Sequence, residues 1–384
     1  MAGHIRRRGK RSWELKLDGG TDSLSGNRKT HYHSYKGTKR EAEIELARLV
    51  TSAASGSYVD PTKLTVGEFL DRWERDWAVN NISPKTLERF AELTKSNVRP
   101  HIGSLSLQKL KPVHCAELYA KLLREGRKKG GGLAPRTVGQ VHGVLHRALG
   151  HALKWGLISV NPCSAAEPPM VATTEIEILT EDQVYDVLQK LRGRPMYVLA
   201  AVGLSTGLRR GELLALRWKD IDFDTANLQV ELSLEQTKAG LRFKEPKTKH
   251  GRRRLALPAS IVAELRFFRR QQQEQRLALG LGKDGPDALV FRRVTGEPLR
   301  PDNVSSEWRR LVRVLGLPKV TLHAWRHTHA SQLIRLNMDV LTISRRLGHG
   351  SPSITLNVYG HLFKGSDDRA ASRIDAAFSR ALTE

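Results

Sequence analysis

Residues 322–328 have the sequence Leu-His-Ala-Trp-Arg-His-Thr, and this short stretch points most directly to the fold. Because His323 and Arg326 are three residues apart, a helix would place both side chains on one face. The stretch Leu347–His349 follows, and Tyr359 comes ten residues after its end. Taken singly, His323 is also compatible with a core histidine and Tyr359 with a packing aromatic. The order and spacing of the residues therefore carry the argument.

Two basic stretches upstream are suited to binding phosphate. Ser205–Leu214 contains a Thr-Gly turn, after which a short helix is expected to begin near Arg209. The start of a helix presents free N–H groups, and an arginine there adds a fork that fits phosphate oxygens. Pro246–Pro258 contains the sequence Pro-Lys-Thr-Lys-His-Gly followed by Arg-Arg-Arg-Leu-Ala-Leu-Pro. We expect it to form a β-hairpin with a basic tip.

In this order and spacing, the four stretches between Ser205 and Leu362 resemble those of the tyrosine recombinases, also called the phage integrase family. The resemblance implies two phosphate-binding arginines, a lysine that acts as general acid, an acid/base histidine, a second histidine that contacts the phosphate, and a nucleophilic tyrosine. These residues are, in turn, Arg209 and Arg326, Lys247, His323, His349 and Tyr359. Glu212 matches an acidic supporting position. Lys249 is the alternative to Lys247, although the downstream Arg-Leu-Ala-Leu-Pro favours Lys247.

These residue types also fit phosphoryl transfer by physical argument. A tyrosine has a pKa of ~10, so forming its phenolate at pH 7 costs about 4 kcal/mol. A cluster of arginine, lysine and histidine lowers that cost and stabilises the extra negative charge of a pentacoordinate phosphorane. Arginines stay charged and bind phosphate with two N–H groups. They can take the place of the metal that many nucleases use.

Two patterns that suggest a cofactor or a metal are set aside. Gly280–Gly285 matches G-x-G-x-x-G, but a helical pattern precedes it and no helix follows, so we expect a surface loop. His323, His327 and His329 are close enough in sequence to suggest a metal, but Arg326 would place a cation among the ligands. There is also no Asp/Glu ligand cluster and no ATP-binding loop. We expect a reaction that needs no metal, no ATP and no other cofactor.

The net charge is +24, from 64 Lys and Arg against 40 Asp and Glu in 384 residues. A field of that size attracts polyanions, and nucleic acid is the commonest of these. It gives affinity and salt dependence rather than sequence choice. A ribosome-associated basic protein is the alternative. We favour DNA because the charge is spread along every segment and accompanies defined motifs.

The cellular compartment is predicted from what the composition lacks. Cys115 and Cys163 are the only cysteines, so neither a disulfide framework nor a zinc knuckle is indicated. No run of ~18 apolar residues occurs. The basic N-terminus has no apolar run after it, unlike a secretory signal. We expect a cytoplasmic, nucleoid-associated protein with no membrane partner.

The predicted fold class is mainly α with small β-sheets, in three domains. Residues 1–60 are expected to be a basic arm-type DNA-binding domain, with a three-stranded sheet and a helix from Lys39 to Leu49. A flexible basic arm is the alternative. Residues 61–165 are expected to be a helical, SAM-like core-binding domain. Residues 176–384 would form the catalytic domain, mostly helical with a small antiparallel sheet near 220–257.

Local signals mark where several helices begin. Thr65 with Glu68, and Thr180 with Gln183, have the form of a capping box. Apolar residues at helical spacing follow the first box at Val66, Phe69, Leu70, Trp73 and Trp77. Prolines suited to the first helical position begin three more helices, at Pro84, Pro112 and Pro135.

The predicted function is site-specific DNA recombination through a 3′-phosphotyrosine, in the integration or excision of a mobile element. A type IB topoisomerase and a non-enzymatic DNA-binding protein on the same fold are the alternatives. His323 and the N-terminal DNA-binding units argue against a topoisomerase. Competent residues at all six catalytic positions argue against a non-enzymatic protein. The resemblance implies double-stranded DNA attachment sites as partner and a homo-tetramer on two duplexes. The C-terminal stripe of Ile374, Phe378 and Leu382 would dock on a neighbour or pack within its own chain. A DNA-bending accessory protein is left open.

Overall fold

The structure is a computed structural model that describes residues 3–21, 28–55, 58–127, 129–172, 177–246, 249–363, 371–376 and 378–379. The chain divides into two compact units, Met1–Thr173 and Thr174–Glu384, each of which is described by itself. None of the helices in the described ranges is long and apolar enough to cross a membrane. Most of both units is helical, and the sheets are small and antiparallel, as predicted.

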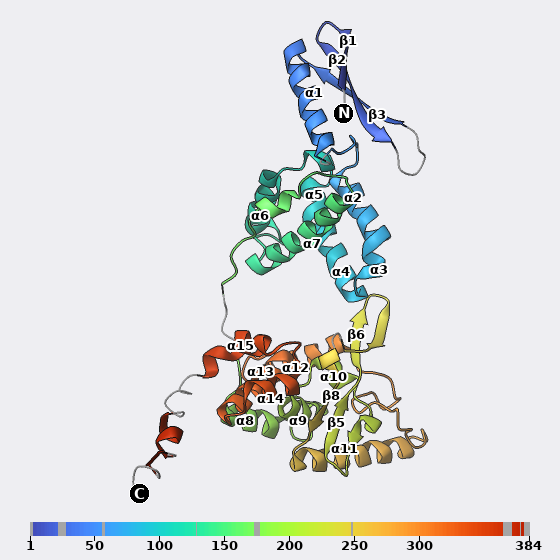
Figure 1. The fold of residues 1–384 in the computed structure, drawn as a ribbon. Coiled ribbons are helices and arrows are strands. Elements are labelled where there is room, and N and C mark those ends of the chain that lie inside the picture. The colour runs from blue at the N-terminus through green and yellow to red at the C-terminus, as the bar shows by residue number, and fades with distance from the viewer. Residues whose placement is uncertain are drawn as a thin grey trace. The chain divides into compact units, whose positions relative to one another are not determined.

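The first unit begins with an antiparallel sheet covered by one helix (Figure 1). Its strands are β1 (Gly3–Gly9), β2 (Ser12–Thr21) and β3 (Arg28–Lys36), and α1 (Lys39–Ala54) follows. Alternation along β2 directs Leu15 and Leu17 to one face, where they are buried with Ala42 and Leu49 of α1. The predicted sheet and helix are confirmed. The pair Gly19-Gly20 lies inside β2.

A helical bundle makes up the rest of the first unit. Its helices are α2 (Val66–Trp73), α3 (Val79–Asn81), α4 (Pro84–Leu93), α5 (Arg99–Ile102), α6 (Pro112–Glu125) and α7 (Pro135–Lys154). The capping box at Thr65 is formed, with both reciprocal hydrogen bonds to Glu68. Phe69 and Trp73 enter a core with Leu145 of α7, so the predicted apolar stripe is confirmed. The stripe spans a π-helical turn at Glu74–Ala78.

The second unit is mostly helical around a small sheet. Its helices are α8 (Glu181–Leu191), α9 (Met196–Thr206), α10 (Arg210–Leu214), α11 (Ala259–Ala278), α12 (Pro301–Val314), α13 (Leu322–Arg335), α14 (Val340–Leu347) and α15 (Pro352–Tyr359). The helix α9 is apolar on every side and is buried almost throughout, so it forms the centre of this unit. Trp325 of α13 and Trp308 of α12 pack edge to face beside it.

The strands of the second unit contradict one prediction. They are β4 (Ile221–Asp222), β5 (Asn227–Val230), β6 (Ser233–Thr237), β7 (Gly240–Lys244) and β8 (Arg253–Ala256). The hairpin joins β6 to β7, and β8 pairs with β5, so the hairpin expected at Pro246–Pro258 is wrong. Pro246 has no N–H with which to continue a ladder from β7. The buried Leu255 instead faces the buried Leu228 of β5.

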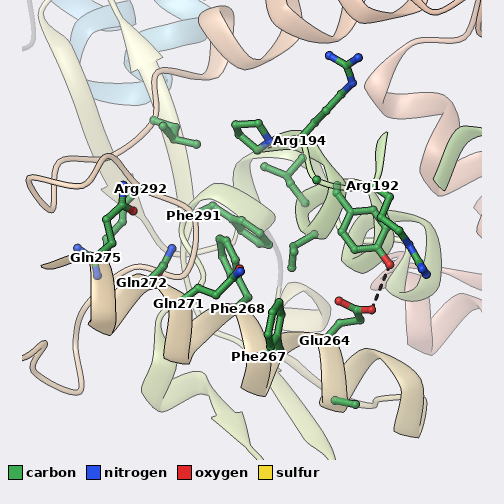
Figure 2. Close-up of a pocket in the computed structure, with 17 residues that line it drawn as sticks. Arg192, Arg194, Glu264, Phe267, Phe268, Gln271, Gln272, Gln275, Phe291 and Arg292 are labelled. Atoms are coloured by element: carbon green, nitrogen blue, oxygen red, sulfur yellow. Dashed lines mark hydrogen bonds between the residues drawn. The ribbon is translucent and has the colours of Figure 1, made fainter. Parts of the chain in front are cut away.

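A groove of about 820 Å³ runs along α11 in the second unit. Figure 2 shows it, with Phe267, Phe268 and Gln272 contributed by α11 and Phe291 by the segment that follows it. Neither Arg209 nor any other predicted catalytic residue is among its described lining residues. The stretch Gly280–Gly285 lies in a loop after α11, as expected.

Candidate active site

Arg209 is positioned by a sharp change of direction between α9 and α10. The helix α9 ends at Gly207, which has φ 66° and ψ 21°, a left-handed conformation that favours glycine. A Cβ at this position would lie 2.7 Å from the ring of His329, so the space also requires glycine. Arg209 is then the N-cap of α10, as predicted. The turn directs its side chain to the surface, where 41% of it is exposed.

Glu212 ties the Arg209 side chain to the start of α10. Its carboxylate accepts from the backbone N–H of Arg209 at 3.0 Å and from Nη1 of Arg209 at 2.8 Å. The Nη2 of Arg209 donates to the carbonyl of Gly348 at 3.3 Å. These contacts leave one edge of the guanidinium facing solvent, and Glu212 itself is buried.

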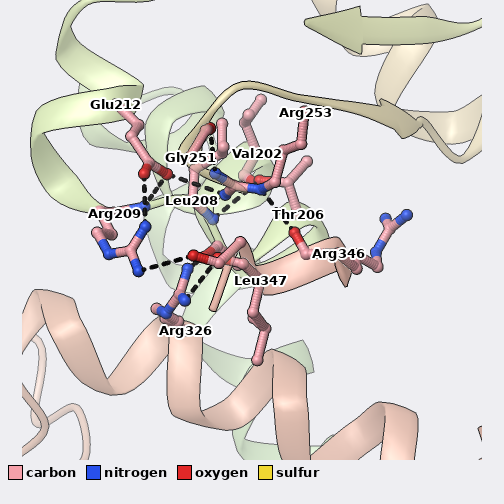
Figure 3. A network of polar contacts seen from close by, with 12 residues as sticks. Val202, Thr206, Leu208, Arg209, Glu212, Gly251, Arg253, Arg326, Arg346 and Leu347 are labelled. Carbon is pink, nitrogen blue, oxygen red and sulfur yellow. Dashed lines mark hydrogen bonds and ion pairs between the residues drawn. The ribbon is translucent and has the colours of Figure 1, made fainter. Parts of the chain in front are cut away.

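A second arginine, Arg253 of β8, contacts Glu212 from the other side (Figure 3). Its Nη2 donates to Oε2 of Glu212 at 2.9 Å, and its Nε donates to the carbonyl of Arg346 at 2.7 Å. Burial alone would raise the pKa of the Glu212 carboxyl, but the charges and hydrogen bonds of Arg253 and Arg209 bring that pKa below its ordinary value. Glu212 is therefore a charged carboxylate between two guanidinium groups.

Arg326 of α13 is almost completely buried behind Arg209. Its Nη1 donates to the carbonyl of Gly207 at 2.9 Å, and its Nη2 donates to the carbonyl of Leu347 at 2.6 Å. Burial and the positive charge of Arg209 lower its pKa to about 9. The carboxylate of Glu212 is hydrogen-bonded to Arg209 and Arg253, whereas Arg326 donates to two neutral backbone carbonyls. An anion bound beside Arg326 and Arg209 would balance the charge of Arg326.

The two predicted histidines both lie close enough to Arg326 for its charge to affect their pKa. His323 is one turn before it on α13 and is exposed; desolvation and then the charges of Arg326 and Arg209 lower its pKa. His349 follows α14 and is partly buried, with its Nδ1 2.8 Å from the hydroxyl of Thr355. Burial, Arg326 and Arg209 lower the pKa of His349 to about 4. These shifts favour the neutral form of both imidazoles.

Tyr359 is the last residue of α15, and its side chain is buried, with 2% exposed. Its phenol lies 2.7 Å from Nδ1 of His327. Burial and the neighbouring charges of His323 and Arg326 lower the pKa of His327 to about 4, so the neutral imidazole accepts this hydrogen bond. Burial raises the pKa of Tyr359 to about 12, against a smaller opposite effect of Arg326. In this conformation the phenol is protonated and covered.

The basic loop between β7 and β8 carries the two candidate lysines. Lys247 lies outside the described residues, and of Lys249 only the backbone, in a 3₁₀ turn Lys249–Gly251, is described. The end of this loop reaches the turn before His349: a Cβ at Gly348 would lie 2.9 Å from the carbonyl oxygen of His250. The loop therefore ends beside the residues that surround Arg209 and Arg326.

The structure thus brings Arg209, His323, Arg326 and His349 into one neighbourhood, with Tyr359 adjacent. Arg253, which lies in a run of three arginines, was not among the predicted site residues. Strand alternation was the available signal, because Arg253 shares a face with the buried Leu255. His327 was considered only as a metal ligand, and nothing in its sequence context indicates its contact with Tyr359.

His329 lies apart from the other two histidines of α13. Its Nδ1 donates to the carbonyl of Leu204 at 3.0 Å, and its Nε2 accepts from Nε of Arg346 at 3.0 Å. These two contacts use both ring nitrogens, so His329 is a neutral structural residue that joins α13, α9 and α14.

Two sequence profiles match the chain over more than half its length. A profile described as "Phage integrase family" matches residues 177–365, and one described as "Phage integrase, N-terminal SAM-like domain" matches residues 65–123. Among individual proteins, a "Tyrosine recombinase XerC-like" of Caldanaerobacter subterraneus subsp. tengcongensis is 26% identical, over 90% of this chain and 91% of that protein. An integrase of Streptomyces ambofaciens is 28% identical, over 89% of this chain and 88% of that protein.

Solved structures share the fold. The integrase of transposon Tn1549 in complex with transposon right end DNA superposes with a TM-score of 0.69 at 24% identity, over 81% of this chain and 99% of that chain. A lambda integrase tetramer bound to a Holliday junction superposes with a TM-score of 0.56 at 20% identity, over 93% of this chain and 94% of that chain.

Replacing Gly207 should weaken the second unit. A left-handed conformation costs a residue with a side chain about 1–2 kcal/mol, and the added methyl would contact His329. Gly207→Ala should therefore lower the denaturant midpoint of this unit. Gly285→Ala, where no atom lies within 4 Å of the added Cβ, is the matched control and should leave the midpoint unchanged. Equal midpoints for the two variants would contradict this account of the turn.

His329 should make the stability of the second unit depend on pH. Burial and the charge of Arg346 lower its pKa in the folded state to about 3, below its ordinary value of 6.5. The stability present above pH 6.5 is therefore lost as the pH falls toward 3, by at most about 1.4 kcal/mol per pH unit from this residue. Urea unfolding at a series of pH values should show a smaller slope in His329→Asn, whose side chain does not titrate. An identical slope would exclude His329 as a source.

Proposed function

The chain belongs to the phage integrase family, the tyrosine recombinases, which cut and rejoin DNA at specific sites, and we propose that Tyr359 is its nucleophile and the Arg209–Arg326 pair its phosphate-binding site. The observation that carries this proposal is that Arg209 and Arg326 converge on the carbonyls of Gly348 and Leu347, next to His349, with His323 one turn from Arg326 and Tyr359 close enough for the charge of Arg326 to act on it. This arrangement suits a single phosphodiester.

We propose the following reaction for these residues and for Lys247. As the oxygen of Tyr359 attacks the scissile phosphorus, its proton passes to His323, the acid/base histidine; the bond to the 5′-oxygen breaks, and a 3′-phosphotyrosine forms. Lys247 gives a proton to the leaving 5′-oxygen. Arg209 and Arg326 bind the non-bridging oxygens through charge-assisted hydrogen bonds, which strengthen as negative charge accumulates. A 5′-hydroxyl from another strand then attacks the phosphotyrosine, which conserves the energy of the original bond and reseals the DNA.

Tyr359 must be uncovered before it reacts. With its pKa raised to about 12, forming the phenolate at pH 7 would cost about 7 kcal/mol, compared with about 4 kcal/mol for a free tyrosine. The buried position therefore disfavours attack. We infer that DNA binding moves the end of α15 and breaks the hydrogen bond to His327, so that the phenol reaches the phosphate beside Arg326.

Three domains are proposed to divide the contacts with double-stranded DNA. Residues 1–60 would bind arm-type sites, residues 61–165 would bind the core site, and residues 176–384 would catalyse the reaction. The separate hydrophobic cores around Leu15, around Trp73 and around α9 support this division. A nucleoid location follows from binding to chromosomal DNA.

A homo-tetramer acting on two duplexes is proposed as the active assembly. Two exposed apolar side chains near the C-terminus, Ile374 and Phe378, support docking on a neighbouring protomer rather than packing within the chain. Leu382, the third residue of this stripe, lies outside the described residues. A DNA-bending accessory protein would assist if the attachment site must be folded back on itself. The DNA-bound tetramer reported for lambda integrase is a precedent on the same fold.

The nucleophile is tested with a nicked attachment site taken from the ends of the mobile element that encodes the protein. Wild-type protein should form an adduct that survives denaturation, because the short strand beyond the nick diffuses away before resealing. Tyr359→Phe should form none, since it lacks the attacking oxygen. Tyr185→Phe, at an exposed tyrosine, is the control and should form as much adduct as the wild type. An adduct in Tyr359→Phe would exclude Tyr359.

The lysine is tested by changing the leaving group. Lys247→Ala should slow cleavage by about 100-fold, as expected for loss of a general acid, and Lys249→Ala by far less. A substrate with sulfur in place of the 5′-bridging oxygen needs no proton on its leaving group, so it should restore cleavage by Lys247→Ala. If the sulfur substrate restores Lys249→Ala instead, Lys249 is the acid.

A further inference from the structure

The buried Arg253 has no role in the reaction as described so far. Its side chain is 6% exposed, so it does not meet DNA directly. Its guanidinium donates to the carboxylate of Glu212 at 2.9 Å, to the carbonyl of Arg346 at 2.7 Å and to the carbonyl of Gly251 at 3.1 Å. These groups belong to the first turn of α10, the last turn of α14 and the loop between β7 and β8.

The contact of Arg253 with Glu212 determines how much of the positive charge of Arg209 is available to a bound phosphate. Glu212 presents one carboxylate oxygen to Nη1 of Arg209 and the other to Nη2 of Arg253. With both arginines present, the three side chains carry a net charge of +1. Without Arg253, Glu212 and Arg209 would neutralise each other at 2.8 Å. A phosphate would then be attracted less, because repulsion by the carboxylate would offset part of the attraction of the guanidinium.

The other two contacts join the catalytic segments to one another. The carbonyl of Arg346 comes three residues before His349, and Gly251 comes four residues after Lys247. At Gly348, which has φ 66°, a Cβ would lie 2.9 Å from Nη1 of Arg253 and 2.9 Å from the carbonyl oxygen of His250. The end of the basic loop and the turn before His349 therefore contact each other through Arg253 (Figure 3).

We propose that Arg253 is a positioning residue for strand cleavage: it neutralises Glu212 so that Arg209 keeps its positive charge for the DNA phosphate, and it fixes Gly251, at the end of the loop before β8, against the turn that carries His349. This inference rests on the proposed function, in which Arg209 binds the scissile phosphate. Arg253 itself touches neither the DNA nor a reacting atom.

The test measures single-turnover cleavage of the nicked attachment site at saturating DNA. Arg253→Met keeps the length of the side chain and removes its charge, so cleavage should slow by about 100-fold, the order expected when one preorganised charge is lost. Adding Glu212→Gln removes the carboxylate that Arg253 neutralised. The double variant Glu212→Gln/Arg253→Met should therefore cleave at least tenfold faster than Arg253→Met. A merely structural role predicts the opposite, because a second buried substitution would add to the damage.

Two further variants separate charge from shape. Arg253→Lys keeps the charge beside Glu212 but cannot make all three contacts, so it should cleave faster than Arg253→Met and more slowly than the wild type. Arg254→Met, at a neighbouring exposed arginine that contacts Asp222 and Thr225, is the matched control and should cleave at the wild-type rate. Arg253→Lys as slow as Arg253→Met would overturn the charge-based proposal. So would wild-type cleavage by Arg253→Met.

Thermal unfolding of the same variants keeps the two proposals distinguishable. If the wild type forms no adduct, the proposed function has failed and cleavage says nothing about Arg253. The pairing of Arg253 with Glu212 is still measured, because Arg253→Met should lower the melting temperature more than the double variant does. A double variant that melts below Arg253→Met would contradict the neutralisation of Glu212. So would a melting temperature of Arg253→Met equal to that of the wild type.

Discussion

Three consecutive backbone carbonyls at the end of α14 each accept a hydrogen bond from a different arginine. Arg253 donates to residue 346, Arg326 to residue 347 and Arg209 to residue 348. The last carbonyls of a helix have no partner within the helix, and the helix dipole makes this end negative. One helix end therefore collects three guanidinium groups from β8, α13 and the start of α10. The arrangement of the other candidate catalytic groups depends on it.

Collecting these charges has an energetic consequence. Like charges held together repel, and among the described residues the carboxylate of Glu212 is the one that pairs with two of the three guanidinium groups. Burial, and then the positive charge of Arg209, lower the pKa of Arg326 to about 9. A phosphodiester is small, anionic and rich in acceptors, so its binding relieves this repulsion. In the proposed reaction the same groups would stabilise the phosphorane, which carries more negative charge than the phosphodiester.

Whether a contact in the fold or the candidate site could be predicted depends on how far apart its two residues are in the sequence. Contacts within one helical turn were predicted: the capping boxes at Thr65 and Thr180, the helix beginning near Arg209, and the shared face of His323 and Arg326. Segment-wide patterns were also sufficient to predict the small sheets and the mostly helical fold. The family resemblance suggested which basic residues belong together, and of these Arg209 and Arg326 both donate to carbonyls at the end of α14.

Contacts between distant segments were not predictable. The two carbonyls that accept hydrogen bonds from Arg326 belong to residues 119 and 21 positions away in the chain, and no local sequence pattern indicates these contacts. Arg253 could not be distinguished by composition from the arginines on either side of it, and the hairpin expected around it was wrong because β8 pairs with β5. The pairing of His327 with Tyr359 joins residues 32 positions apart. The three-domain division and the role of Lys247 remain predictions.

The central claim is that this cluster of arginines binds the DNA phosphate that Tyr359 attacks. The most direct measurement is to digest the covalent protein–DNA adduct with nuclease and protease and to identify the modified peptide by mass spectrometry. The account predicts a nucleotide linked through its 3′-phosphate to the oxygen of Tyr359. A nucleotide on any other side chain, or one linked through a 5′-phosphate, would contradict it.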